Sequence, residues 1–223
     1  MDKSRNWRIG ATSFLVTAAF LAECSAVPVQ AAAAMDSVTN ERIVSSVSSN
    51  PSAALKKKIT REANLALRAL KDRDFETLAD MAAPSGIRFS PYAYVGVGAD
   101  LVLTPQQIRE AWENRKPYIW GLYDGSGEVI RLDFRGYYDR FLNNLPYTAP
   151  DGVGYNRIIG SGNTVSNLKE VYPDAQFVEF YVKGGRSGIG NVGGMDWGSL
   201  RFVFEQKQGE WKLSGIISDQ WTI

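Results

Sequence analysis

The sequence predicts an α+β fold, a curved antiparallel sheet with N-terminal helices packed on one face. Three observations lead to this prediction. Apolar residues at helical spacing come first, strand-like segments predominate in the last third, and short turns join several of the strands. A βαβ series would instead alternate helices and strands along the whole domain.

The first 34 of the 223 residues are typical of a secretion signal. Lys3, Arg5 and Arg8 precede an uncharged, mostly apolar run from Ile9 to Ala22. As a helix this run is roughly 21 Å long, whereas the hydrocarbon core of a bilayer measures about 30 Å. Small residues follow the run, as in a cleavable signal. We therefore expect residues 1–34 to be removed, with a retained membrane anchor as the alternative.

The expected localisation is secreted or in the cell envelope. Leu21-Ala22-Glu23-Cys24 resembles a bacterial lipobox, but Glu23 stands where a small residue is expected. Lipid anchoring through Cys24 is thus the less favoured route. The polar, Ser-rich residues 35–50 are interpreted as a linker, and residues 51–223 as a single α+β domain.

Composition excludes several function classes. Without residues 1–34 the chain keeps 22 basic and 22 acidic residues, so no strong field attracts nucleic acid or anionic lipid. The chain has no histidine and one cysteine, Cys24, which rules out Ser-His-Asp and Cys-His catalysis and argues against a zinc site. We expect no cofactor, no metal, no nucleic-acid partner and no transmembrane segment in the mature chain. The oligomeric state stays open.

The first half of the domain is expected to hold three helices and a strand. Asn50 caps a helix that starts at Pro51, with an apolar face made by Leu55, Ile59, Ala63, Ala66 and Leu70. Asp74 caps a second helix that Pro84 stops. The alternating segment Gly86–Val95 predicts a strand interrupted at Pro91. The capping box Thr104–Gln107 starts the third helix.

The second half is expected to be richer in strands. Segments Tyr118–Tyr123 and Glu128–Leu132 form two strands, and Asp133 caps a helix. The apolar stripe of this helix comprises Phe134, Tyr137, Tyr138, Phe141 and Leu142. The remaining expected elements are a strand at Tyr155–Gly160, a helix at Thr164–Tyr172, a strand at Phe177–Lys183, and a hairpin through Gln208-Gly209 that pairs Leu200, Phe202 and Phe204 with Trp211, Leu213 and Ile217.

Two glycine-containing motifs favour plain loops over ligand sites. Gly188–Gly193 matches G-x-G-x-x-G, but a strand follows it where a dinucleotide site needs a helix. The segment Asp124–Glu128 offers oxygen ligands, yet fewer than a calcium loop requires. We interpret the first as a loop between strands and the second as a hairpin turn.

Carboxylates are the candidates for acid–base chemistry, because histidine is missing. Glycosidases use two carboxyl groups about 5–10 Å apart. The residues considered are Asp133, Asp139, Glu179, Asp196 and Asp219. Glu179 sits in an apolar strand, where burial would raise its pKa; the alternative is a cross-strand pair with Arg201.

Tyrosine and tryptophan concentrate near expected turns and strand ends. Such rings combine an apolar face with a polar group and suit sugar or peptide clefts, although they can equally build an aromatic core. The candidate ligand-binding residues are Tyr92, Tyr94, Trp120, Asp124, Tyr137, Glu179, Trp197, Asp219 and Trp221.

Several segments resemble a family of exported proteins from Bacillus-like bacteria. The resemblance covers roughly residues 55–223 and rests on Gly86–Tyr92, Trp120–Gly127, Gly162–Thr164, Met195–Trp197 and Asp219–Ile223. It implies export and brings no catalytic residues. More loosely, the opening helix and Asp74–Leu78 resemble the start of NTF2-like cone folds, which implies a pocket between sheet and helices.

Three functions remain. The favoured one is a non-catalytic envelope or extracellular module that binds a small molecule, glycan or peptide. The second is a carboxylate-dependent hydrolase acting on cell-wall or extracellular substrates. The third is a structural or assembly protein whose exposed aromatic residues contact a partner chain.

Overall fold

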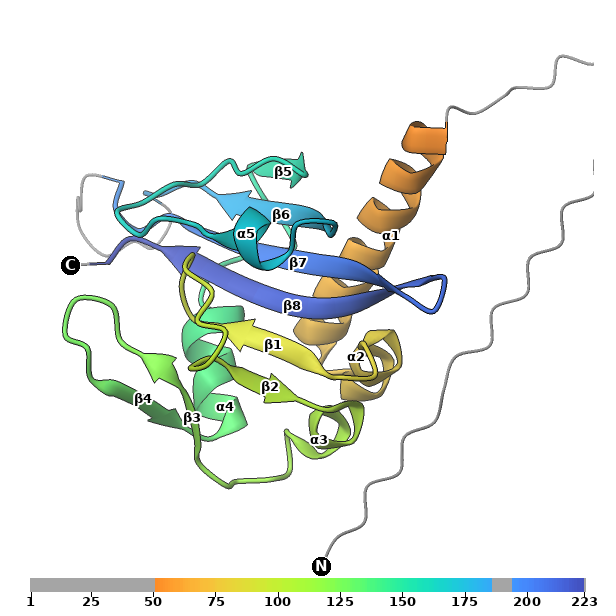
Figure 1. Ribbon diagram of the computed structural model, residues 1–223. Coiled ribbons are helices and arrows are strands. Elements are labelled where there is room, and N and C mark those ends of the chain that lie inside the picture. The colour runs from red at the N-terminus through yellow and green to blue at the C-terminus, as the bar shows by residue number, and fades with distance from the viewer. Residues whose placement is uncertain (1–50, 186–193, 223) are drawn as a thin grey trace, which may run out of the picture. The chain divides into compact units, whose positions relative to one another are not determined.

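The computed structural model describes residues 51–185 and 194–222 (Figure 1). Contacts divide the chain into two units, residues 1–46 and 47–223, and every described residue belongs to the second. The expected signal, the linker, the Asn50 cap and the Gly188–Gly193 motif lie outside the described residues.

The elements are α1 (Pro51–Asp72), α2 (Phe75–Met81), β1 (Ile87–Ser90), β2 (Leu101–Leu103), α3 (Pro105–Glu110), β3 (Tyr118–Leu122), β4 (Val129–Leu132), α4 (Phe134–Tyr137), a π-helical turn η1 (Tyr138–Leu142), β5 (Gly152–Tyr155), α5 (Leu168–Val171), β6 (Gln176–Val182), β7 (Gly198–Lys207) and β8 (Glu210–Gln220).

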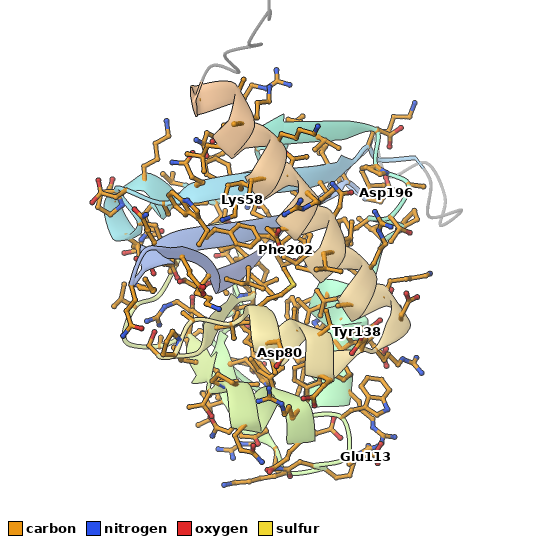
Figure 2. All side chains as sticks on the ribbon, turned by 90° about the vertical axis from the view of Figure 1, so that its right-hand side faces the viewer. Lys58, Asp80, Glu113, Tyr138, Asp196 and Phe202 are labelled. Atoms are coloured by element: carbon orange, nitrogen blue, oxygen red, sulfur yellow. The ribbon has the colours of Figure 1, made fainter. Side chains whose placement is uncertain are left out.

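The α+β prediction is confirmed. Six strands form one sheet in the order β2-β1-β8-β7-β6-β5, and β3 and β4 form a separate two-stranded sheet. Neighbouring strands are antiparallel except β1 and β8, which run parallel. Helix α1 crosses the six-stranded sheet on one side, as Figure 2 shows with Phe202 behind the helix. We call the side against α1 the inner face and the other side the outer face.

The inner face is mainly apolar. Val178, Phe180 and Val182 from β6 share one buried cluster with Leu200, Phe202 and Phe204 from β7. The expected face of α1 packs against them, with Ile59, Ala63, Ala66 and Leu70 buried and Leu55 partly buried. The apolar residues at helical spacing in α1 and the alternating apolar residues of β6 and β7 therefore face each other, as the sequence predicted.

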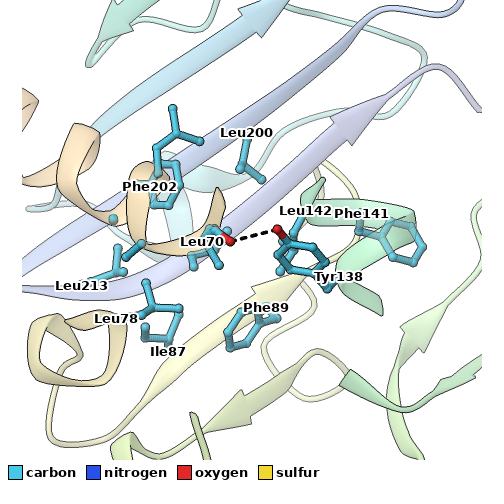
Figure 3. Packing of buried hydrophobic residues seen from close by; sticks show 14 of the residues in the cluster. Leu70, Leu78, Ile87, Phe89, Tyr138, Phe141, Leu142, Leu200, Phe202 and Leu213 are labelled. Carbon is cyan, nitrogen blue, oxygen red and sulfur yellow. Dashed lines mark hydrogen bonds between the residues drawn. The ribbon is translucent and has the colours of Figure 1, made fainter. Parts of the chain in front are cut away.

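Aromatic rings fill the space between sheet and helices. The stripe of α4 and η1 is buried, and the Tyr138 hydroxyl donates to the Leu70 carbonyl at the end of α1 over 2.9 Å (Figure 3). Trp120 of β3 stacks on Tyr137 with ring centroids 3.8 Å apart and planes 14° apart. Phe89 and Phe134 complete the cluster with edge-on contacts. In this chain, the region where the NTF2-like resemblance implied a pocket is core.

The outer face is covered by loops. Residues 91–100, which follow β1, and residues 156–175, which precede β6, lie over it and meet where the Asn167 side chain bonds to both backbone groups of Val95. Beneath them a second buried cluster comprises Val95, Leu168, Tyr172, Phe177, Val203 and Ile217. Helix α5 is a single turn within this cover.

Local signals placed several elements correctly. Asp74 accepts a hydrogen bond from the Thr77 amide and caps α2, and Thr104 and Gln107 form the expected capping box of α3. Gln208 and Gly209 both have positive φ, 53° and 84°, and turn β7 into β8 as a two-residue hairpin requires.

Three expectations were wrong in detail, and one strand was missed. The strand expected at Tyr155–Gly160 is β5 at Gly152–Tyr155, because the amides of Ile159 and Gly160 bond to the Glu179 carboxylate instead of to a neighbouring strand. The helix expected at Thr164–Tyr172 spans only Leu168–Val171. The short strand β2 was not predicted. The register of β7 and β8 shifts at Val203/Phe204, so Ile217 lies on the outer face and Leu213 on the inner one.

Candidate functional site

The candidate site lies at the end of the sheet where β7 begins and β8 ends. Three loops meet there: the β3–β4 turn, residues 91–100 after β1, and residues 160–164 of the outer-face cover. Figure 1 shows the β3–β4 turn and the C terminus on the same side of the sheet. Loops positioned by a rigid sheet are where binding residues usually lie.

Asp124 joins these segments through its side chain. Its Oδ2 accepts a hydrogen bond from the Thr222 hydroxyl over 2.8 Å and another from the Thr164 hydroxyl. These hydroxyls, with help from the Gly125 amide, lower the pKa of the Asp124 carboxyl. Asn163 in turn bonds to the backbone of Thr222 in both directions. The carboxylate is thus ionised at neutral pH and held in place.

The expected hairpin turn at Asp124–Glu128 is present. The Tyr123 amide donates to the Glu128 carbonyl over 2.7 Å, and Gly125 and Gly127 have positive φ. Within residues 51–185 and 194–222, no group of three or more cysteine, aspartate or glutamate residues is arranged to hold a metal ion.

Three adjoining hollows lie around this cluster. The central hollow, of about 390 Å³, is lined by Tyr92, Tyr123, Asp124, Ser126, Glu128, Arg140, Gln220, Trp221 and Thr222. The Tyr94 hollow, of about 480 Å³, is lined mainly by residues 91–100 and the β3–β4 turn. The Trp197 hollow, of about 260 Å³, is lined by Asn144, Leu145, Met195, Asp196, Trp197, Gln220 and Trp221. Five of the nine candidate ligand-binding residues therefore line this end of the sheet: Tyr92, Tyr94, Asp124, Trp197 and Trp221.

These five differ in accessibility. Tyr94 is 59% exposed and Trp221 41%, whereas Tyr92 and Trp197 are each 8% exposed. Burial raises the pKa of the Tyr92 hydroxyl, so that hydroxyl stays protonated and can donate a hydrogen bond. The Arg140 guanidinium lies 5.0 Å from the centroid of the Tyr123 ring. The central hollow thus offers rings, a fixed carboxylate, a cation and hydroxyl groups.

Trp120 and Tyr137 do not belong to the site. Both are fully buried in the aromatic core, and burial also raises the pKa of the Tyr137 hydroxyl. Their place in the sequence, near an expected turn and on a helix stripe, was compatible with either role. The structure gives them the core role, so they are corrections to the candidate set.

Glu179 and Asp219 form a buried ion cluster with Arg201 on the outer face. The Arg201 Nη2 donates to Glu179 Oε1 over 3.1 Å, to Asp219 Oδ2 over 2.7 Å and to the Gly160 carbonyl over 2.9 Å. Glu179 and Arg201 are 0% exposed and Asp219 is 2% exposed. The cross-strand alternative for Glu179 is the one observed, because the two residues are direct partners in β6 and β7.

The cluster holds one cation against two carboxyl groups. Burial raises the pKa of Asp219 to about 6, although Arg201 opposes the shift. No substrate reaches Glu179 or Asp219 in this arrangement, so a hydrolase that uses this pair is not supported. The Asp133 carboxylate also has structural partners: it caps α4 and forms an ion pair with Arg115 over 2.7 Å.

The outer-face loop from residue 156 to 164 is pinned at two places. At one, Ile159 and Gly160 bond to Glu179, and a Cβ at Gly160 would lie 2.6 Å from the Trp197 ring. At the other, Asn163 and Thr164 bond to Thr222 and Asp124. We call residues 156–164 the strap. It links the buried ion cluster to the candidate site.

Sequence reasoning missed the polar residues that assemble the site. Asn163, Thr164 and Thr222 are common surface residues whose partners are 40 to 98 positions away, and Arg140 lies in a helix expected only for its apolar stripe. The only available signal was that the family-like motifs Gly162–Thr164 and Asp219–Ile223 contain Asn163, Thr164 and Thr222; no motif pointed to Arg140.

Comparisons with known proteins found solved structures that are similar only at low TM-scores. No family model matches the chain, and neither does any curated protein. Among solved structures, the association domain of C. elegans CaMKII is 17% identical and matches 75% of this chain and 96% of its own, with a TM-score of 0.31. A protein named as an NTF2 variant, Rd1NTF2_05, is 13% identical over 76% and 99%, with a TM-score of 0.29. A structure from Xanthomonas campestris described as a calcium/calmodulin-dependent protein kinase II association domain is 14% identical over 74% and 86%, with a TM-score of 0.30.

These neighbours are too distant to decide on the loose NTF2-like resemblance, which stays a prediction. At TM-scores near 0.3 the description of the fold rests on this chain's own strand order and pairing, and the resemblance to exported proteins of Bacillus-like bacteria stays a prediction. In the part of the chain that is described, no helix has both the length and the apolar character needed to cross a membrane.

Proposed function

We propose that this protein is an exported, non-catalytic module that binds a small, ring-containing polar ligand at the end of its sheet. The export proposal is supported by residues 1–34 alone. The binding proposal is carried by one observation, the central hollow in which Asp124 is fixed between Tyr92, Tyr123 and Trp221.

The chemistry of the hollow supports binding over catalysis. Asp124 already accepts hydrogen bonds from two hydroxyl groups that lower its pKa, which makes it a poor general acid. Such a carboxylate can still accept further hydrogen bonds from ligand hydroxyl or amino groups, while the tryptophan and tyrosine rings pack on apolar ligand surface. A hydroxylated or aminated ring compound meets both requirements.

The test is a thermal-shift screen of the purified protein with sugars, amino sugars, short peptides and anionic wall fragments. A ligand that binds the folded state stabilises it by RT ln(1 + [L]/Kd), so the melting temperature rises with the logarithm of the ligand concentration once that concentration exceeds Kd. Trp221→Ala should abolish the shift. Leu65→Ala is the matched control, because Leu65 is similarly exposed, at 44%, and lies on α1. A shift that Trp221→Ala leaves intact would place binding elsewhere.

Assembly is the second candidate. Ile119, Leu122 and Val129 of the β3–β4 hairpin are 48%, 53% and 48% exposed, and Leu122 and Val129 are cross-strand partners. Adjacent exposed apolar residues are typical of protein contact surfaces. Light scattering over a range of concentrations tests self-association, and a constant monomer mass would contradict it.

A further inference from the structure

The three hollows form a row along the end of the sheet. The central hollow shares Tyr92, Tyr123 and Asp124 with the Tyr94 hollow. It shares Gln220 and Trp221 with the Trp197 hollow. A single elongated ligand can therefore contact all three by passing over the Asp124 cluster and the Gln220–Trp221 pair.

Each hollow contributes its own aromatic side chain. Tyr94 lines the hollow at one end of the row, Trp221 lines the central hollow, and Trp197 lines the hollow at the other end. Tyr94 and Trp221 are the more exposed, at 59% and 41%, so each leaves surface free for a ligand. Repeated rings at intervals suit a ligand whose own rings repeat, since each apolar ring face can pack on one aromatic side chain.

The charge of the row selects among linear polymers. Asp100, Asp124, Glu128 and Asp196 line it, whereas Arg140 is the one cation among the lining residues that the structure describes. An acidic lining repels polyanions and accepts neutral or positively charged chains.

The geometry also weighs against an extended peptide that adds a strand to the sheet. Such binding needs an open strand edge, but β7 and β8 are paired with each other from Gly198 and Gln220 to the hairpin turn. The walls of the row are turns and side chains. Sugar hydroxyl groups can bond to these carboxylate and amide groups without any free backbone edge.

We infer that the occupant of this row is a linear glycan of neutral or amino sugars, with successive sugar rings in neighbouring hollows. This inference rests on the proposed binding function and specifies its ligand class. It predicts that affinity depends on chain length, because only an oligomer can contact all three aromatic side chains.

Titration calorimetry with N-acetylglucosamine oligomers of increasing length provides the test. Affinity should rise about tenfold or more from the single sugar to the trimer and level off once the row is filled. Partly deacetylated oligomers should bind at least as well, and galacturonic acid oligomers of equal length should bind more weakly.

Variants distinguish the end of the row from its centre. Tyr94→Ala should lower the affinity for long oligomers about tenfold and leave the single sugar unchanged. Trp221→Ala should weaken binding at every length. Val97→Ala is the matched control for Tyr94, because Val97 is 60% exposed in the same loop and is not part of the lining.

The possible contrary results separate the two proposals. Equal affinity for single sugar and oligomers overturns the row while leaving the proposed function standing. A lysine-rich peptide or an anionic oligomer that binds more tightly, with the same sensitivity to Tyr94→Ala, overturns the glycan class. If no sugar binds and the thermal-shift screen finds another ligand, only the glycan inference fails; if nothing binds in either experiment, both fail.

Discussion

The two faces of the six-stranded sheet are buried by different means. On the inner face, apolar side chains of β6 and β7 meet the apolar side of α1. On the outer face, β6, β7 and β8 carry the ion cluster of Glu179, Arg201 and Asp219 beneath loops that have little regular structure. Hydrophobic contact is non-directional and tolerates local adjustment, whereas a buried ion cluster depends on each partner. The stability of the outer face should thus depend more strongly on single substitutions and on pH than the stability of the inner face.

The largest effect is expected on the inner face. Phe202→Ala removes a fully buried ring that packs edge-on against Phe180 at 5.8 Å, and α1 cannot move into the cavity without losing its other contacts. We expect a loss of about 4 kcal/mol in the free energy of unfolding, measured by urea denaturation. Val153→Ala on the exposed part of β5 serves as the control and should change little. A loss below about 1 kcal/mol would show that the inner face is not the main core.

Arg201→Ala should cost nearly as much on the outer face, by a different mechanism. It leaves Glu179 and Asp219 buried with no cation between them, a situation that costs about 3 kcal/mol. Adding Asp219→Asn should recover part of this loss because one of the two unbalanced charges disappears. A double-mutant cycle measures the coupling. Additive effects of the two substitutions would mean that the cluster is not an electrostatic unit.

The inner face could be predicted from sequence because its information is periodic or local. The stripe from Phe134 to Leu142 repeats at helical spacing, and Asp74 and Gln208-Gly209 act within a few residues of themselves. The β-bulge between β7 and β8 marks the limit, since strict alternation placed Ile217 on the wrong face.

The outer face and the site could not be predicted in this way. Ile159 and Gly160 have the composition of a strand, yet their amides bond to a carboxylate about 20 residues away. Thr164 was expected in a helix, but its hydroxyl bonds to Asp124. For Trp120 and Trp221 the residue type is identical and the burial opposite. Only the packing of distant segments decides these outcomes.

The pH dependence of the free energy of unfolding should come from the outer face and not from the inner face. The pKa of Asp219 is raised from 3.8 to about 6, so the folded state binds this proton more tightly than the unfolded state. The resulting stability is complete below pH 3.8 and is lost as the pH rises through 6. Between pH 7 and pH 5 the protein should therefore gain about 1 kcal/mol. No histidine titrates in this range.

Urea denaturation at both pH values measures this gain, and Asp219→Asn should remove it. Among the described residues, the buried charged side chains are Glu179, Arg201 and Asp219, all on the outer face, so the inner face offers no comparable group. If the wild type and Asp219→Asn show the same pH dependence, the proton bound between pH 7 and pH 5 belongs to another residue. The ion cluster would then not cause the pH dependence of stability.

The smallest effect tests whether the strap holds the outer-face cover in place. Asp124→Asn weakens the hydrogen bonds from Thr164 and Thr222, so at this end the strap is held mainly by the bonds between Asn163 and Thr222. Because Asp124 is exposed, we expect a loss in stability of about 1 kcal/mol or less. Amide hydrogen exchange should nevertheless become faster at Asn163, Thr164 and Thr222, because these amides open locally.

Asp74→Asn is the matched control for Asp124→Asn. Asp74 is also an exposed carboxylate bonded to a threonine hydroxyl, over 2.6 Å, and its pKa is likewise lowered by that hydroxyl. Its partner lies three residues away in α2, and asparagine caps a helix as well as aspartate does. Asp74→Asn should therefore leave hydrogen exchange in the strap unchanged. If both variants accelerate exchange there equally, Asp124 does not anchor the strap, and the outer face is held by its ion cluster, its apolar contacts and the hydrogen bonds of Asn163 and Asn167.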